Sequence, residues 1–431
     1  MTAKTQGRPT YTGVVMGIVL AFFALFTYVG PLGYALTATF GGLLLLGYWR
    51  HVRDYGWVGL CLLALLLWMV SRSTLLHDLS SGADFSQYDT WEDQDWLKVM
   101  LQPVWYGALI LAAWYMRPRT ASTLMNGLFY AYIGLCGLII VDALSGARIY
   151  QAISAAIYQP IRPDLAVVKL SIATYAFVLL FWSMQLISAS RPPLLRIVAL
   201  AACLLAPLLT GASAPILAMI VSFIVFWLVK RVPRIGPFSI YQVLATVTGL
   251  KILFFPVAID VVRRLGWGDN VRQFLPASWD ARLDIWEFAA EKIWQKPLLG
   301  WGFDASRHFG KAIPLHPHNM SIQVGLELGY VGLFVLAGLW VLLILRIGRG
   351  ADVPSGESLS AFSELNEGPE ATDPRPYALA TASAVFVIAQ LSFGIWQEWW
   401  LAMMALTVAI FLMAKTTAGD VSSGDKLQNI L

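Results

Sequence analysis

The chain has 431 residues, of which 58% are hydrophobic and 13% are charged, and its mean hydropathy is +0.65. A soluble domain carries roughly 25% charged residues, so this composition excludes an ordinary soluble globular protein. The net charge of +4 says little about nucleic acid, because membrane topology distributes the positive charges, and we expect no nucleic-acid partner. Three widely separated cysteines in apolar runs argue against a closed disulfide framework.

Twelve apolar runs, most of them about 16–25 residues long, are long enough to cross a bilayer. They lie near 12–30, 32–49, 56–71, 98–116, 123–142, 165–189, 194–210, 214–230, 238–262, 320–346, 378–394 and 398–414. The first run lacks a small-residue cleavage site and leads directly into the second, so we expect no cleaved signal peptide. The sequence predicts an all-α polytopic membrane protein with about twelve transmembrane helices.

The distribution of lysine and arginine predicts the orientation of these spans. With the amino terminus inside, the inner segments hold sixteen basic residues and the outer segments hold four, leaving aside the long loop 263–319. We therefore expect both termini in the cytoplasm and this loop on the outer side of the membrane. The predicted divisions are a first membrane bundle at 1–262 with about nine spans (12–262), an outer loop at 263–319, three last spans at 320–414 with a cytoplasmic linker at 350–377, and a cytoplasmic tail at 415–431.

An acidic stretch occupies the first long outer segment, at 84–96. Asp93 and Asp95 form an Asp-x-Asp pair of the kind that holds a divalent metal on a sugar diphosphate. Short acidic loops are more often simply solvated, so we predict no metal and leave this pair as the alternative.

Among the charged residues inside predicted spans, where an ionisable group is costly, three are candidates for a role: Lys169, Lys251 and Glu327. Lys169 and Lys251 either extend to an interface along their flexible stems or take part in a site. Glu327 lies about two turns into its span, and we expect a functional role or a role in helix pairing.

The long loop 263–319 is unusually basic for an outer segment. It contains Arg263, Arg264, Arg272, Arg282, Lys292, Lys296, Arg307 and Lys311, and three of the five histidines of the chain. A loop of this length crosses the membrane whatever its charge, so the basic residues either have no function or form a surface for a phosphate or diphosphate.

Within that loop, residues 282–294 have the periodicity of an amphipathic helix. Leu283, Trp286, Ala290 and Ile293 recur on one face. We expect this helix to lie in the membrane interface on Trp286 and Trp294, with Arg282 at the depth of the phosphate headgroups. A glycine-rich bend at 297–303 follows.

The loop ends in His316-Pro317-His318-Asn319, just before the tenth apolar run. An imidazole at the mouth of a span can take a proton from a hydroxyl near neutral pH, which makes His318 a candidate general base. His316 is a candidate substrate contact or second polar group of the site, and otherwise half of a weak metal pair. Asn319 either orients the imidazole or contacts a sugar. His308 is expected to be incidental.

These residues resemble the O-antigen ligase and polymerase superfamily of bacterial envelopes. The resemblance rests on Arg282 with Ile285-Trp286, on the segment Pro297–Gly302, and on His318-Asn319 with a nine-residue gap to Gly329. It covers roughly residues 278–335, and the spacing of the last motif is similar to the ligase branch.

The resemblance implies a metal-independent, cofactor-free glycosyltransferase whose donor is a glycan on undecaprenyl diphosphate. Its acceptor would be lipid A–core oligosaccharide or another glycan. It also implies that His318 is the catalytic base and that Arg282 binds the diphosphate, with Lys169 where the family has an arginine, and with Arg263 or Arg264 as a further basic residue. A lysine at that position lacks the two-pronged geometry of arginine.

Three functions remain open from the sequence: a ligase, a polymerase or ligase using another acceptor, and a transporter or flippase. A transporter would line a path across the membrane with charged or broken helices, whereas the polar groups here collect beside one interface. The sequence therefore favours surface chemistry and the ligase. It predicts neither the sugar nor the oligomeric state.

Overall fold

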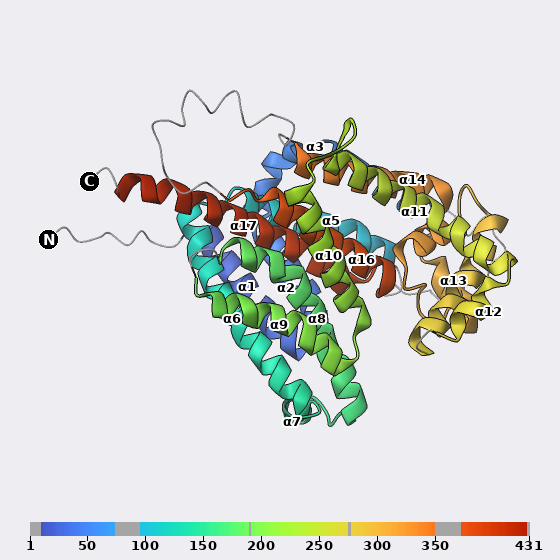
Figure 1. Ribbon diagram of the computed structural model, residues 1–431, viewed down its shortest axis with the longest axis horizontal. Coiled ribbons are helices and arrows are strands. Elements are labelled where there is room, and N and C mark those ends of the chain that lie inside the picture. Colours follow the sequence, from blue (N-terminus) through green and yellow to red (C-terminus); the bar gives the residue numbers. More distant parts are fainter. Residues whose placement is uncertain (1–9, 74–94, 189–190, 275–276, 350–371, 429–431) are drawn as a thin grey trace.

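The protein is described here by a computed structural model that covers residues 10–73, 95–188, 191–274, 277–349 and 372–428 (Figure 1). The chain begins with α1 (Tyr11–Val29), α2 (Leu32–Leu44), the 3-10 helix η1 (Leu46–Tyr55), α3 (Gly56–Ser71), α5 (Asp95–Trp114), α6 (Pro118–Leu144), α7 (Arg148–Ile157), α8 (Pro163–Leu186), α9 (Pro193–Thr210) and α10 (Ser213–Arg231). It continues with the strands β1 (Arg234–Ile235) and β2 (Phe238–Ser239), then α11 (Ile240–Arg264), α12 (Trp267–Arg272), α13 (Ala277–Gln295), the 3-10 helix η3 (Ala305–Ala312), α14 (Met320–Gly348), α16 (Arg375–Leu391) and α17 (Glu398–Gln428). The prediction of an all-α polytopic membrane protein is consistent with this structure.

Every one of the twelve predicted apolar runs coincides with a helix. Among the described residues, nine helices are long and apolar enough to cross a membrane, and α2 and the apolar part of α5 are shorter. The number of twelve transmembrane helices therefore stays a prediction. The short antiparallel pair of β1 and β2, which precedes α11, was not predicted.

Local sequence explains where several helices begin. Proline in the first turn of α6, α8 and α9 supplies a backbone already restricted to helical φ. Ser239 begins α11 with a capping box, in which its hydroxyl and the side chain of Gln242 satisfy each other's backbone N–H groups. Asn319 caps α14 in a similar way, and this cap belongs to the candidate site described below.

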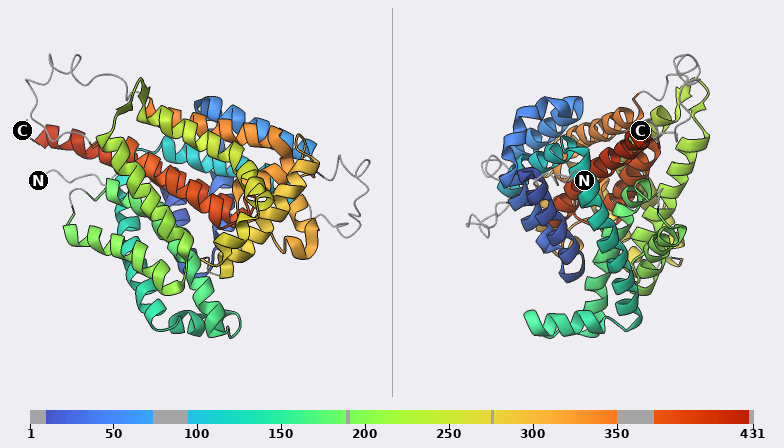
Figure 2. Two further views of the ribbon diagram at one scale, coloured as in Figure 1. Left: turned by 45° about the vertical axis from the view of Figure 1, so that its right-hand side comes forward. Right: turned by 90° about the vertical axis from the view of Figure 1, so that its left-hand side faces the viewer.

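The helices lie across one another in a bundle in which the start of α1 and the end of α17 are on one side and α12 and α13 are on the opposite side (Figures 1 and 2). α17 packs against α2, α5, α6 and α8, and α16 packs against α8 and α10. Helices of the predicted first membrane bundle and of the last three spans therefore share one core.

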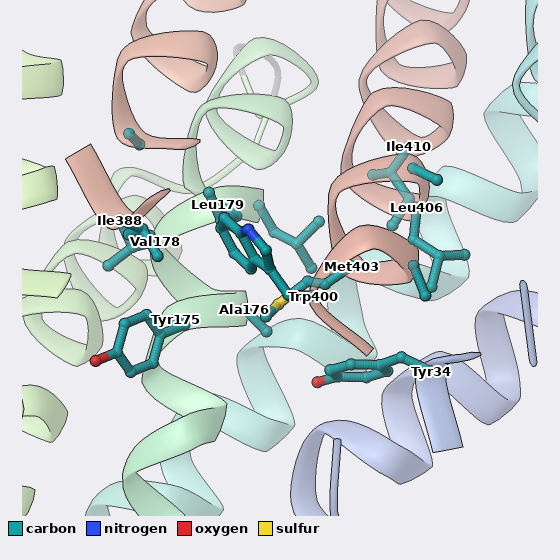
Figure 3. Close-up of a cluster of buried hydrophobic side chains, with 14 of the residues drawn as sticks. Tyr34, Tyr175, Ala176, Val178, Leu179, Ile388, Trp400, Met403, Leu406 and Ile410 are labelled. Carbon is teal, nitrogen blue, oxygen red and sulfur yellow. The ribbon is translucent and has the colours of Figure 1, made fainter. Parts of the chain in front are cut away.

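Trp400 on α17 lies at the centre of this core and is fully buried. Figure 3 shows Trp400 between side chains of α8 and α17, with Tyr34 of α2 below it in this view. Tyr175 of α8 lies at the edge of the cluster with its hydroxyl directed away from Trp400 (Figure 3). This edge leads to the candidate site.

Many large apolar side chains stay exposed on the outer surfaces of α1, α2, α3 and α11, among them Phe22, Phe40, Leu63 and Phe254. Water would disfavour such surfaces, but the hydrocarbon of a bilayer does not. The exposure pattern agrees with helices that face lipid.

Candidate functional site

The site begins at the first turn of α14. The Oδ1 atom of Asn319 accepts the backbone N–H of Ile322 (2.9 Å), and its Nδ2 atom donates to the backbone carbonyl of Gln390 on α16 (2.8 Å). Asn319 is fully buried, and both ends of its amide have protein partners. The side chain therefore ties the beginning of α14 to the end of α16.

His318 precedes this cap and has a φ of 54°, a left-handed conformation that is uncommon for a residue with a side chain. Its Nδ1 atom lies 2.7 Å from the backbone carbonyl oxygen of Ser392. A carbonyl oxygen only accepts, so Nδ1 carries the hydrogen and Nε2 holds the free lone pair. The backbone at Ser392 thus selects the tautomer that a general base needs.

Burial lowers the pKa of His318 below its ordinary value of 6.5, and the nearby charge of Arg282 lowers it further, although the Ser392 carbonyl acts in the opposite direction. The imidazole is therefore neutral at pH 7 and able to accept a proton. An anion bound at Arg282 would offset that positive charge and make the imidazole more basic.

His316 supports the same turn. Its Nδ1 atom is 3.3 Å from the backbone nitrogen of His318, its Nε2 atom is 3.2 Å from the side-chain amide of Gln397, and the two imidazole rings are 4.1 Å apart. Burial, followed by the charges of His318 and of the loop arginines, lowers the pKa of His316 to about 3. His316 is therefore a neutral, buried hydrogen-bonding group.

The segment from Ser392 to Gln397, between α16 and α17, forms the other wall of the site, and sequence reasoning missed it. The backbone N–H of Ile395 donates to Oε1 of Gln323 (3.0 Å), and Nε1 of Trp396 donates to Oε2 of Glu327 (2.6 Å). The break between the last two apolar runs was the only sequence signal for this segment.

Two glycine-containing stretches of the sequence meet at a break in α14. Gly329 has a φ of 66°, and a Cβ atom there would lie 2.2 Å from the carbonyl oxygen of Leu298. Conversely, a Cβ atom at Gly300 would lie 2.4 Å from the carbonyl oxygen of Glu327.

The interrupted helix satisfies its backbone groups across this contact. The backbone N–H groups of Trp301 and Gly302 donate to the carbonyls of Leu326 and Glu327, each at 2.9 Å, and the N–H of Tyr330 donates to the carbonyl of Pro297 (2.8 Å). Glycine at 300 and 329 therefore lets the backbone after α13 approach the backbone of α14 closely, and this contact fixes the end of α13 against α14.

The predicted amphipathic face of α13 is confirmed, because Leu283, Trp286, Ala290 and Ile293 are all buried. Its partner is protein and not lipid: the cluster includes Ile259 of α11 and Ile322 and Leu326 of α14. The expectation that Trp286 rests in the membrane interface is wrong. Its Nε1 atom donates to the carbonyl of Pro317 (2.7 Å), so Trp286 holds the turn that carries His318. Trp294 is 41% exposed.

Arg282 lies in the second turn of α13 beside the two histidines. Its charge acts on His316, on His318 and on the Tyr175 hydroxyl of α8, and its guanidinium carbon is 5.5 Å from the ring of Trp279. No acidic partner of Arg282 is found among the described residues. Burial lowers the pKa of Arg282 from its ordinary value, but a guanidinium keeps its charge. Among the described residues, Arg282 therefore presents a positive charge without an acidic partner next to the candidate base.

The other predicted basic residues are placed differently. Arg263 pairs with Asp260 (2.9 Å) and Glu291 (3.3 Å), and Arg264 pairs with Asp260 (2.7 Å), so both already have anionic partners. The pairs with Asp260 lie within α11, and the pair of Arg263 with Glu291 joins α11 to α13. Lys169 is exposed on α8, six residues before Tyr175. The predicted binding of a diphosphate by these three residues stays a prediction.

The metal alternative falls largely outside the described chain. Asp93 is not among the described residues, and Asp95 is described only as the first residue of α5. Within the described ranges, no group of three or more histidine, cysteine, aspartate or glutamate side chains has an arrangement that could hold a metal ion.

Residues 198–337, from α9 into α14, match a family model described as O-antigen ligase. This segment contains Arg282, both histidines and the paired glycines, whereas Lys169 and the Ser392–Gln397 segment lie outside it. The resemblance predicted from residues 278–335 is confirmed. This segment is therefore similar to the O-antigen ligase family, and the apolar helices of the fold are consistent with a multi-pass membrane protein.

Parts of curated relatives are also similar to this chain. A protein of Rickettsia bellii is 28% identical over 209 residues, which cover 45% of this chain and 45% of that protein. A Rickettsia conorii protein is 28% identical over 165 residues (35% of each chain), and a Rickettsia typhi protein is 31% identical over 134 residues (28% of each chain). All three carry the name "Putative polysaccharide ligase". The aligned part spans less than half of the length of these relatives.

Proposed function

We propose that this protein is a glycosyltransferase of the O-antigen ligase type, which moves a glycan from undecaprenyl diphosphate to lipid A–core oligosaccharide at the periplasmic face of the inner membrane. The observation that carries the proposal is the pair formed by His318 and Arg282. One offers a free Nε2 lone pair in a fixed tautomer, and the other offers a positive charge without an acidic partner in the described chain.

The reaction follows from these two groups. Nε2 of His318 takes the proton of the acceptor hydroxyl, and the oxygen attacks the anomeric carbon from the face opposite the diphosphate. The bond from the anomeric carbon to the diphosphate oxygen breaks, its electron pair stays on that oxygen, and the configuration inverts. A positioned base contributes about 10²–10⁴-fold to such a step. Arg282 counters the charge that develops on the leaving diphosphate.

The surrounding residues receive supporting roles in this proposal. His316 and Asn319 hold the turn that carries His318, because both are buried and bonded to protein groups. Lys169 adds positive charge on the α8 side, where Tyr175 already lies near Arg282. Arg263 holds α13 against α11 through its ion pair with Glu291, Arg264 pairs with Asp260 within α11, and both arginines contribute to the positive potential.

The test is transfer by the purified protein in detergent, with glycan-diphosphate-undecaprenol as donor, in the presence and absence of a chelator. Lipid A–core is offered in one reaction and no separate acceptor in another. The proteins are the wild type, His318→Ala, Arg282→Ala and the control His308→Gln, which changes an exposed histidine of the same loop.

Transfer to lipid A–core that is lost in the first two variants and kept in the control is the expected result. Chain lengthening without lipid A–core would instead identify a polymerase that uses the same chemistry. Normal transfer by a folded His318→Ala protein would refute the assignment of the base. Transport of the donor across proteoliposomes without bond transfer would replace the proposal by a flippase.

A further inference from the structure

Lys251 occupies an unusual place for a charged residue. It lies near the middle of α11 (Ile240–Arg264), about 16 Å from its first residue and about 20 Å from its last at 1.5 Å per residue. Its Nζ atom is 4.1 Å from the ring centre of Phe255 and 5.5 Å from that of Phe386, and it donates a hydrogen bond to Oε1 of Gln390 on α16.

The side chain therefore does not extend to an interface, as the sequence allowed. No acidic partner of Lys251 is found in the part of the chain that the structure describes. A lysine within a transmembrane helix is costly and is usually functional. The contact with Gln390 connects Lys251 to the first turn of α14.

Gln390 is the point at which α16 holds the start of α14. Its side-chain amide contacts the hydroxyl of Ser321, with Nε2 at 3.0 Å and Oε1 at 3.2 Å, and its backbone carbonyl accepts Nδ2 of Asn319 at 2.8 Å. Two residues further on, the carbonyl of Ser392 fixes Nδ1 of His318. The last turn of α16 thus positions both the cap of α14 and the candidate base.

We infer that Lys251 is a positioning residue for the transfer reaction. Its N–H holds the Gln390 amide in the orientation that meets Ser321, which keeps the end of α16 against the first turn of α14. That placement preserves the bond between His318 and Ser392 and so keeps Nε2 of the base facing the acceptor. The inference rests on the proposed function, because it assigns a purpose to the same base.

Two substitutions of Lys251 separate the possible roles of its side chain. Lys251→Met keeps the length and removes the donor, whereas Lys251→Gln keeps a donor without the charge. The matched control is Leu250→Met, because Leu250 is the preceding residue of α11 and is 49% exposed on the outer surface of the bundle. Gln390→Met and the double variant Lys251→Met/Gln390→Met complete the set.

The measurements are the kcat and KM for the lipid-linked donor, and hydrogen exchange of the backbone at 388–397 by mass spectrometry. For Lys251→Met we expect kcat to fall by about 10–100-fold, since small misplacements of reacting groups have such effects, with KM unchanged. We expect faster exchange at 388–397 than in Leu250→Met. Lys251→Gln should recover part of the loss, and the double variant should lose no more than the more impaired single variant.

Several results would overturn the inference. A raised donor KM with unchanged kcat would make Lys251 a charge on the diphosphate. If the kcat losses of the two single variants multiply in the double variant, Lys251 does not act through Gln390. The same conclusion follows if Lys251→Gln is as impaired as Lys251→Met. Should Lys251→Met fail to fold, Lys251→Gln and Gln390→Met still test the contact. The exchange measurement needs no turnover, so it remains informative even where His318→Ala keeps transfer and the proposed function fails.

Discussion

The charge of Arg282, which has no acidic partner in the part of the chain that the structure describes, makes a prediction that separates catalysis from stability. Arg282→Gln removes the guanidinium and keeps a polar side chain of moderate size. Because no ion pair of Arg282 is found in the described chain, the substitution breaks none that the structure records. We expect the free energy of unfolding to change by no more than about 0.5 kcal/mol, as for substitutions away from such pairs.

The effect on catalysis should be large. A positive charge about 4 Å from a phosphate oxygen, at an effective dielectric constant of about 20, is worth about 4 kcal/mol before desolvation. At 1.36 kcal/mol for each tenfold change in rate, this corresponds to about 10³-fold. Desolvation of Arg282 on binding reduces that figure, so we expect kcat/KM to fall by about 10²–10³-fold. The kcat/KM of Arg282→Lys should lie between those of the wild type and Arg282→Gln, since lysine keeps the charge and loses the two-pronged geometry.

Arg272 provides the matched control. It pairs with Asp280 (2.6 Å), Asp284 (2.7 Å) and Glu287 (3.1 Å), which hold α12 against α13. Arg272→Gln leaves three carboxylates close together, and we expect it to lower the free energy of unfolding by about 1 kcal/mol with a smaller effect on catalysis.

Initial rates over a range of donor concentrations, together with thermal unfolding of the same preparations, measure both effects. The reasoning about Arg282 fails if Arg282→Gln unfolds as easily as Arg272→Gln and loses activity only in proportion to its folded fraction. It also fails if kcat/KM is unchanged in a folded protein.

Three further predictions concern the structure around the base. Gly329→Ala should lower the free energy of unfolding by about 2 kcal/mol or more, because its Cβ would meet the carbonyl of Leu298 at 2.2 Å; thermal unfolding unchanged from the wild type would contradict this. Trp286→Phe leaves the buried carbonyl of Pro317 without its donor, which costs about 1–3 kcal/mol, and we expect kcat to fall as well; an unchanged kcat would disconnect this bond from the base. The pKa of His316 is lowered from 6.5 to about 3 in the folded state, so the unfolded state takes up the proton first and the stabilisation is lost as pH falls below 6.5. Between pH 7 and pH 5 the wild type should lose about 2 kcal/mol from this group, measured by unfolding at both values, and equal losses in His316→Gln would refute the assignment.

The periodicity of residues 282–294 shows how far sequence reasoning reached within the site. It identified the buried face of α13 correctly, because an apolar stripe at helical spacing must be covered by something. It could not say whether lipid or protein covers that stripe, since both are apolar surroundings. The structure places Trp286 on Pro317, and this contact turns an expected membrane anchor into a support of the candidate base.

The composition, the apolar runs and the motifs within 278–335 were sufficient to predict a helical membrane protein and its family resemblance, and the roles of His318 and Arg282 stay predictions. Those features are local, since hydrophobic length and residue type reflect the surrounding solvent and the chemistry of a single side chain. The fixed tautomer of His318, the support from Gln390 and Lys251, and the existing partners of Arg263 and Arg264 depend on segments up to about 140 residues apart in the chain. Only the packing of α11, α13, α14 and α16 against one another brings these groups within hydrogen-bonding distance, and backbone carbonyls such as that of Ser392 carry no sequence signal at all.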